Sequence, residues 1–183
     1  ITLEAGVNAI TVVGKNSYLA RHFLDTEGGR RAVALSHDEV SSIPLTTTDC
    51  IVNFAYPGAY MTDPYDPAND MDRLIAEHIK DTGIHFVMFS SRKVYDRETP
   101  SPWEESSPLS GQNVNGENKI ITEEHVRRTL EGRQTILRLP NVIEMAPGRH
   151  TFMGIALDTL KAEGCIRLDI HPATERDFLP IAN

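Results

Sequence analysis

The sequence predicts an α/β fold in which a doubly wound parallel sheet carries helices on both faces. Short apolar runs rich in β-branched residues alternate along the chain with segments of helical periodicity. The connections between them are short, and such strand–helix–strand units form parallel sheets with right-handed crossovers. With 183 residues, the chain is also long enough to bury a full hydrophobic core around such a sheet.

Each predicted strand is a short apolar run. The runs cover residues 9–13, 31–35, 50–55, 84–89, 134–139 and 166–170. The run at 84–89 is nearly continuous in hydrophobicity, which is typical of a strand buried on both faces of a sheet. Pro140 ends the run at 134–139, because proline cannot donate a hydrogen bond to a neighbouring strand.

Helices are predicted where apolar residues recur every three or four positions. Such segments lie at 18–24, 69–83, 118–130 and 152–160. The clearest of them places Met71, Leu74 and Ile75 on one face. Asn69 is a suitable N-cap and Gly83 stands where a C′ glycine belongs, so we expect this helix to fill the interval between them.

Composition and charge narrow the class of protein. The chain has 18 basic and 26 acidic residues, a formal net charge of −8, which argues against nonspecific binding to nucleic acids or anionic membranes. We find no apolar run that could span a membrane and no signal peptide. Cys50 and Cys165 lie far apart and the seven histidines have no paired spacing, so we expect no metal site. Two unpaired thiols are typical of the cytoplasm, where we expect the protein to be located.

The residues that follow the first predicted strand indicate a nucleotide site. In sheets of this kind, ligands bind outside the carboxyl ends of the strands. There the chain reads Gly14-Lys-Asn-Ser-Tyr-Leu-Ala20, which opens the first predicted helix. A helix N-terminus after a tight glycine turn can hold a dinucleotide pyrophosphate on its N–H groups. Serine and alanine replace the second and third glycines of the G-x-x-G-x-x-G spacing, so a plain turn without a ligand is the alternative.

Two further segments carry groups that can take part in proton transfer. Phe89-Ser-Ser-Arg-Lys-Val-Tyr95 follows the buried strand, and Asn113-Val-Asn-Gly-Glu-Asn-Lys119 opens the charged helix. A hydroxyl, an acid–base group and a lysine at strand ends can bind a carbonyl and relay its proton. Each segment alone is weak evidence, because a serine pair is usually a turn, and Lys119 with Glu123 four residues later is usually a surface ion pair.

Taken together and in this order, the motifs resemble the extended short-chain dehydrogenase/reductases, the NAD-dependent epimerase/dehydratase branch that modifies nucleotide sugars. Further landmarks are Pro102-Trp-Glu-Glu-x-x-Pro108, Leu137-Arg-Leu-Pro-Asn141 and Glu175-Arg-Asp-Phe-Leu179. The resemblance implies a Rossmann-type NAD(P)-binding domain over residues 1–150, with NAD or NADP as cofactor. It implies that residues 151–183 begin a substrate-binding lobe. Because the family continues well past this point, we expect that C-terminal lobe to be incomplete.

The resemblance also implies roles for single residues. Ser91 would hydrogen-bond the reacting sugar oxygen, and Lys119 would hold the nicotinamide ribose and lower the pKa of a catalytic tyrosine. Arg92, Asn141 and Arg176 would contact the substrate, with Arg176 as an anion clamp. The implied cofactor-binding residues are Gly14, Asn16, Ser17, Tyr18, Leu19, Ser36, Phe54, Ala55, Tyr56, Ser90 and Lys119.

The sequence departs from the family pattern at three places. Asn115 stands where the family has its catalytic tyrosine, and an amide cannot titrate, although it can donate a hydrogen bond to a developing alkoxide. Arg92 and Lys93 replace the acidic pair of the sugar 4,6-dehydratases, which disfavours dehydration. The strand before Ser36 ends with no immediate carboxylate, which leaves the choice between NAD and NADP open.

We therefore expect an NAD(P)-dependent nucleotide-sugar oxidoreductase, of the 4-epimerase or the 4-keto-sugar reductase type, that acts in polysaccharide precursor synthesis. Asn115 could impair its activity. The alternative from another class is a non-catalytic relative that binds a dinucleotide or sugar nucleotide and acts as a sensor or partner subunit. A third reading is a domain that binds only protein. An exposed edge of the incomplete lobe would favour a homodimer.

Overall fold

The computed structural model of the chain describes residues 9–100, 102–143, 152–166 and 177–181. The chain divides into two compact units, residues 1–138 and 139–183. In the part of the chain that the structure describes, no helix is both long and apolar enough to cross a membrane.

The first unit is built on a five-stranded sheet with the order β2-β1-β3-β4-β5. The strands are β1 (Ile10–Val13), β2 (Val33–Leu35), β3 (Cys50–Asn53), β4 (His85–Ser91) and β5 (Gln134–Leu139). β1 pairs in parallel with both β2 and β3, and β3 pairs in parallel with β4. The chain therefore changes direction across the sheet between β1 and β3. This confirms the predicted doubly wound parallel sheet, and it makes the gap between these two strand ends the expected ligand position.

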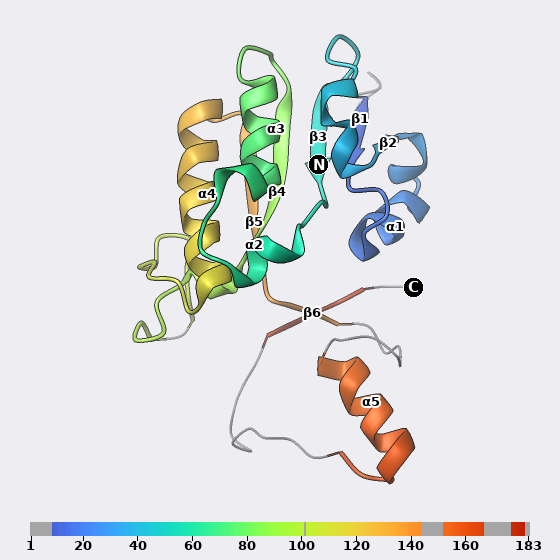
Figure 1. The fold of residues 1–183 in the computed structure, drawn as a ribbon, viewed down its shortest axis with the longest axis vertical. Coiled ribbons are helices and arrows are strands. Elements are labelled where there is room, and N and C mark those ends of the chain that lie inside the picture. The colour runs from blue at the N-terminus through green and yellow to red at the C-terminus, as the bar shows by residue number, and fades with distance from the viewer. Residues whose placement is uncertain (1–8, 101, 144–151, 167–176, 182–183) are drawn as a thin grey trace. The chain divides into compact units, whose positions relative to one another are not determined.

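Four helices and four short 3₁₀ turns connect the strands. The helices are α1 (Tyr18–Asp25), α2 (Gly58–Thr62), α3 (Met71–Ile79) and α4 (Val114–Leu130). The turns are η1 (Gly29–Arg31), η2 (His37–Ser42), η3 (Pro67–Asn69) and η4 (Arg92–Val94). In Figure 1, α3 and α4 lie side by side on one side of the sheet and α1 lies on the other, as the sequence predicted.

Alternate strand residues supply the two hydrophobic cores, one on each face of the sheet. Val13 and Phe86 belong to a cluster with Ile75 of α3 and Val126 of α4. Val12, which precedes Val13 in β1, belongs to the cluster around α1 with Ala20, Val52 and Phe54, and Phe23, Val87 and Phe89 pack against this cluster. This alternation follows from the two-residue repeat of a strand.

The expectation that the strand at 84–89 is buried on both faces was wrong. In β4, Phe86, Met88 and Ser90 are buried beneath α3 and α4, whereas Val87 and Phe89 on the other face are only half-buried. The structure covers that second face with a cluster whose single helix, α1, has eight residues. Within the described part of the first unit, this eight-residue helix covers only part of the face.

The predicted helix at 69–83 is shorter than expected at both ends. Asn69 belongs to η3, and the N-cap of α3 is Asp70, whose carboxylate accepts a hydrogen bond of 3.1 Å from the backbone N–H of Arg73. The helix ends before Lys80, so Gly83 is not its C′ residue. A proline-initiated turn, Pro67–Asn69, moves the start of the helix beyond Asn69.

The second unit contains α5 (Phe152–Glu163) and a parallel pair of strands, β6 (Asn141–Ile143) and β7 (Phe178–Pro180). The sequence predicted α5 but neither of these strands, because each is only three residues long. The strand predicted at 166–170 lies outside the described residues, apart from Ile166.

Candidate functional site

Gly14 makes the turn between β1 and α1, and its position requires glycine. Its φ is +87°, a conformation that residues with a side chain rarely adopt. A Cβ at Gly14 would lie 2.4 Å from the backbone nitrogen of Ala55 and 2.8 Å from the carbonyl carbon of Phe54. The turn after β1 therefore lies directly against the segment that follows β3.

The serine in place of the second glycine is the N-cap of α1. The Ser17 hydroxyl oxygen accepts a hydrogen bond of 3.2 Å from the backbone N–H of Ala20, and the backbone N–H of Ser17 donates to the Gly14 carbonyl. The N–H groups of Tyr18 and Leu19 lie in the first helical turn, where no helical carbonyl precedes them. Backbone N–H groups at the N-terminus of a helix can bind an anion.

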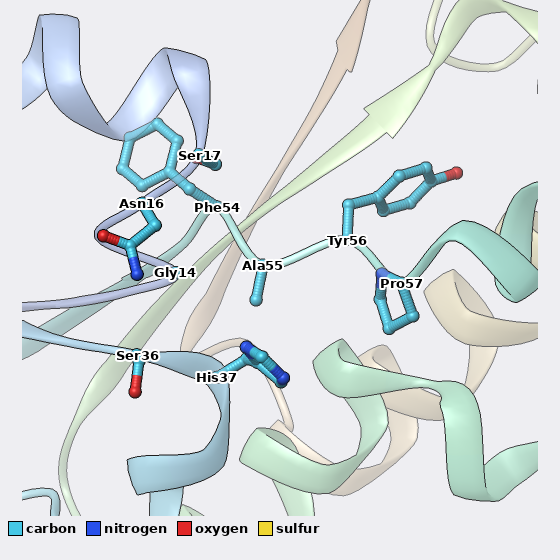
Figure 2. Close-up of a pocket in the computed structure, with 9 residues that line it drawn as sticks. All are labelled: Gly14, Asn16, Ser17, Ser36, His37, Phe54, Ala55, Tyr56 and Pro57. Atoms are coloured by element: carbon cyan, nitrogen blue, oxygen red, sulfur yellow. The ribbon is translucent and has the colours of Figure 1, made fainter.

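A pocket of about 190 Å³ opens at the point where the strand order reverses (Figure 2). It is lined by Gly14, Asn16, Ser17, Ser36, His37, Phe54, Ala55, Tyr56 and Pro57. Seven of these are predicted cofactor-binding residues, and His37 and Pro57 were not predicted. Tyr18, Leu19, Ser90 and Lys119 do not belong to the lining. The volume is below the roughly 300–1,000 Å³ of a complete ligand site, so the pocket can take only part of a dinucleotide.

Two carboxylates turn back toward the end of β2. Glu39 accepts hydrogen bonds from the backbone N–H of Ser36 (2.7 Å), from its hydroxyl (2.8 Å) and from the ammonium of Lys15 (3.1 Å). Asp38 accepts one from the Ser36 hydroxyl as well. The bonds from Ser36, with Lys15 nearby, lower the pKa of Glu39 to about 2. Asp38 and Glu39, which follow Ser36 by two and three residues, therefore lie beside it at the edge of the pocket.

Lys119 of α4 forms a buried ion pair. Its ammonium lies 2.7 Å from a carboxylate oxygen of Asp72 on α3, and the two side chains are 4% and 5% exposed. Asn53, at the end of β3, donates a hydrogen bond of 2.7 Å to the other oxygen of Asp72. Burial raises the pKa of Asp72, and the charge and hydrogen bond of Lys119 oppose that rise.

Tyr56 lies over this ion pair and reaches Asn115. Its ring centroid is 4.8 Å from the ammonium of Lys119, and its hydroxyl donates a hydrogen bond to the side-chain oxygen of Asn115. Tyr60 flanks Lys119 at 5.2 Å and packs edge-on against Tyr56. Burial, with the nearby charges of Asp72 and Asp70, raises the pKa of Tyr56 above that of an ordinary tyrosine.

Glu123 does not pair with Lys119, contrary to the expectation of a surface pair. It is fully buried, and Arg138 of β5 donates to both of its carboxylate oxygens, at 2.7 and 3.0 Å. The Ser90 hydroxyl and Arg127 donate to it as well, at 2.5 and 2.9 Å. Burial alone would raise the pKa of Glu123, but the hydrogen bonds from Arg138 and Ser90 hold it below the ordinary glutamate value.

The two serines that end β4 have different partners. Ser90 faces the core and is held by Glu123, whereas the Ser91 oxygen accepts a hydrogen bond of 3.2 Å from the backbone N–H of Lys93 and caps η4. Arg92 is the first residue of that turn. Asn141 begins β6 in the second unit, and Arg176 lies outside the described residues. The roles predicted for all of them stay predictions.

The sequence did not predict the buried ion pair of Asp72, because an acidic residue at this position of a helix looks like an exposed one. The sequence also did not predict the contact between Tyr56 and Asn115. Both depend on how α3, α4 and the segment after β3 pack together. The resulting arrangement combines an open pocket at a strand switch, helix N–H groups that can hold an anion, and two phenol rings that adjoin a buried lysine, one of which lines the pocket. Such a site can bind a dinucleotide and donate a proton.

The chain is similar to a known protein family. A family model described as the RmlD substrate binding domain matches residues 68–168 of the chain. No curated protein matches the sequence.

Several solved structures share the fold. The dTDP-4-dehydrorhamnose reductase of Yersinia enterocolitica is 21% identical with a TM-score of 0.66, and the match covers 85% of this chain and 61% of that one. The same enzyme from Bacillus anthracis, solved in complex with NADP, is 14% identical with a TM-score of 0.70, covering 87% and 62%. The UDP-N-acetylglucosamine 4-epimerase of Bacillus cereus is 13% identical with a TM-score of 0.74, covering 94% and 69%. The chain thus spans 61% of the length of the Yersinia reductase.

Proposed function

Because the chain belongs to the family of the RmlD substrate binding domain, we propose that it carries the dinucleotide-binding part of an NAD(P)-dependent nucleotide-sugar oxidoreductase. Within this class, we propose reduction of a 4-keto sugar rather than 4-epimerisation. The proposal includes residues 1–150 as the NAD(P)-binding domain and 151–183 as the start of a substrate lobe. It also includes the cytoplasm as location and a homodimer as assembly.

The observation that carries the proposal is the pocket at the switch between β1 and β3. It runs from Ser36, at the end of β2, past Gly14 to Tyr56, which touches Asn115. Gly14 approaches the backbone of Ala55 so closely that a Cβ at position 14 would collide with it. A dinucleotide laid along this line would place one ribose at Ser36, the pyrophosphate at the N-terminus of α1 and its other end near Tyr56.

The residues that would hold the cofactor are those predicted from the sequence. Gly14, Asn16 and Ser17 would surround the pyrophosphate with the N–H groups of Tyr18 and Leu19, while Ser36 would face the adenine ribose. Phe54, Ala55 and Tyr56 would form the opposite wall, with Ser90 and Lys119 behind them. When bound, the reduced cofactor would supply a hydride to the sugar.

The substrate would be a nucleotide sugar with a carbonyl group. Two of the similar structures are reductases of dTDP-4-dehydrorhamnose, which makes this keto sugar the first compound to test. Ser91, Arg92, Asn141 and Arg176 remain the proposed substrate contacts. Asn115 would act on the reacting oxygen only as an uncharged hydrogen-bonding group, because an amide does not titrate.

A second candidate, a relative that binds ligands without catalysis, is favoured by the ion pair between Lys119 and Asp72. That carboxylate neutralises the charge that would otherwise lower the pKa of a neighbouring tyrosine.

Two measurements separate the candidates. Fluorescence titration with NADH and NADPH tests whether the pocket binds a dinucleotide, with Trp103 and the nicotinamide as reporters. Transfer of deuterium from reduced cofactor to dTDP-4-dehydrorhamnose tests for the reaction. The proposed function requires both dinucleotide binding and deuterium transfer. Binding without transfer would favour the second candidate, and no binding of either dinucleotide would refute the proposed oxidoreductase.

A further inference from the structure

Reduction of a carbonyl requires a proton for the oxygen, and the pocket lining limits where that proton can come from. Among the nine lining residues, only His37 and Tyr56 carry a side chain that titrates. His37 begins η2, which follows β2, and β2 lies at the edge of the sheet beyond β1. Tyr56 follows β3, on the side toward α4. The two candidates therefore come from segments that follow different strands.

The ring of Tyr56 is held in place by three neighbours. Lys119 contacts the ring face, Tyr60 packs edge-on at 5.5 Å, and Asn115 accepts the hydrogen bond from the hydroxyl. Figure 2 shows the ring on the side of the chain opposite to the Ala55 methyl group. Tyr56 is nevertheless 39% exposed, so a ligand can reach it.

Tyr18 of α1 packs edge-on against His22 and does not belong to the lining. Three other phenols of this region have partners elsewhere. The Tyr60 hydroxyl bonds with Thr122, and the Tyr65 hydroxyl donates to Asp70 at 2.9 Å. The Tyr95 ring stacks on Trp103, and the Arg138 guanidinium lies 4.9 Å above it. None of these three lines the pocket. Tyr56 is the phenol that both lines the pocket and touches Asn115.

We propose that the Tyr56 hydroxyl delivers the proton to the carbonyl oxygen of the keto sugar, with Asn115 as the residue that positions it. This inference rests on the proposed function. The carbonyl carbon accepts the hydride supplied by the reduced cofactor, and the π electrons move to the oxygen. The O–H bond of Tyr56 breaks as the new O–H bond of the sugar forms. The resulting phenolate takes a proton from water, so the sugar is reduced and the cofactor oxidised.

The electrostatics of the site suit a donor better than a base. Asp72 neutralises Lys119, and burial together with Asp72 and Asp70 favours the protonated phenol. A phenol that keeps its proton at neutral pH can protonate an alkoxide but is a poor acceptor from an alcohol. The arrangement therefore favours reduction over the alcohol oxidation with which a 4-epimerase begins.

The test compares Tyr56→Phe with a matched control, Tyr65→Phe, in the purified chain. Both changes remove one phenolic hydroxyl, but Tyr65 does not line the pocket. With NADPH and dTDP-4-dehydrorhamnose, Tyr56→Phe is expected to lower kcat by about 10²–10⁴. Its affinity for NADPH should match that of the wild type, and Tyr65→Phe should keep the wild-type kcat. Asn115→Ala should lower kcat without changing the KM for NADPH.

A second measurement does not depend on turnover. The chain loaded with NADP⁺ cannot transfer hydride, so binding of the keto sugar can be titrated at equilibrium. Tyr56→Phe removes one hydrogen bond to the carbonyl, so this affinity should be about two- to tenfold weaker than in the wild type. The Tyr65→Phe control should bind the sugar as the wild type does.

The outcomes distinguish this inference from the proposed function. Failure to bind either dinucleotide would refute the proposed function. Wild-type turnover that persists in Tyr56→Phe would overturn the inference alone, and so would unchanged sugar affinity in the NADP⁺ complex. A wild-type chain that binds both ligands but transfers no hydride would refute the proposed function and favour the non-catalytic relative.

Discussion

The ammonium of Lys119 lies 2.7 Å from the carboxylate of Asp72, and this pair is almost completely buried between α4 and α3. Lys119, which the sequence predicts to bind the cofactor, therefore also links α4 to α3 through this ion pair. Its carboxylate partner is held by Asn53 at the end of β3, so one cluster links the sheet, α3 and α4.

Removing either member of this pair should destabilise the fold. Lys119→Met leaves a buried carboxylate and Asp72→Asn leaves a buried ammonium, so each is expected to cost about 3–5 kcal/mol in the free energy of unfolding. The double variant Asp72→Leu/Lys119→Met removes both charges and should recover most of that loss. Urea denaturation of the three variants measures these differences. Single variants that cost less than about 1 kcal/mol would contradict a tightly coupled pair.

Gly14→Ala should damage both the turn and the pocket. The residue would be held at a positive φ, which costs about 1–3 kcal/mol, and its Cβ would collide with the backbone of Ala55. We expect lower stability and loss of dinucleotide binding, measured by thermal unfolding and fluorescence titration. Gly83→Ala is the control, because nothing lies within 4 Å of the added methyl. Equal effects of the two substitutions would argue against the close approach.

The stability of the fold should depend on pH through Glu123. Its pKa in the folded chain lies below the ordinary glutamate value of 4.5. The contribution of the ionised group to stability is therefore complete above pH 4.5, and it is lost as the pH falls through the folded-state pKa. Glu123→Gln should lower the free energy of unfolding by about 2–4 kcal/mol at neutral pH, and should flatten the decline in acid.

The control for that prediction is Glu124→Gln, which neutralises an exposed neighbour. Urea midpoints measured from neutral to acidic pH should follow the wild type in this control. If Glu123→Gln showed the same acid-dependent loss as the wild type, the pH dependence would have to come from another group.

Glu39→Gln should shift the preference between NADPH and NADH. Glu39 pairs with Lys15 at 3.1 Å, beside the predicted ribose position at Ser36. Neutralising Glu39 frees the Lys15 ammonium for a 2′-phosphate. The effect should be modest, because a half-exposed ion pair contributes little free energy. We expect the ratio of NADPH to NADH affinity to rise about two- to fivefold. Glu27→Gln, at an exposed pair with Arg31, should leave the ratio unchanged.

The fold could be predicted from local patterns, because these patterns report directly on strands and helices. The runs that became β1, β3 and β4 end at one edge of the sheet, so the residues after them were recognisable as candidates. Gly14 was identified this way, and its positive φ and contact with Ala55 explain why a glycine stands there.

The chemistry between elements could not be predicted in the same way. Asp72 and Lys119 are 47 residues apart, and Tyr56 and Asn115 are 59 apart, so no spacing rule relates them. The four-residue spacing of Lys119 and Glu123 suggested that they pair with each other, but Lys119 pairs with Asp72 and Glu123 with Arg138. α4 packs against both α3 and the sheet, so Lys119 turns toward α3, while Glu123 turns toward β4 and β5.

The contact between Gly14 and the segment after β3 also limits how this protein can change. The atoms nearest to Gly14 are backbone atoms of Ala55 and Phe54, not their side chains. No replacement at either position can create room for a larger residue at position 14. Selection for second-site suppressors of Gly14→Ala should therefore recover revertants to glycine, and not compensating changes at position 54 or 55.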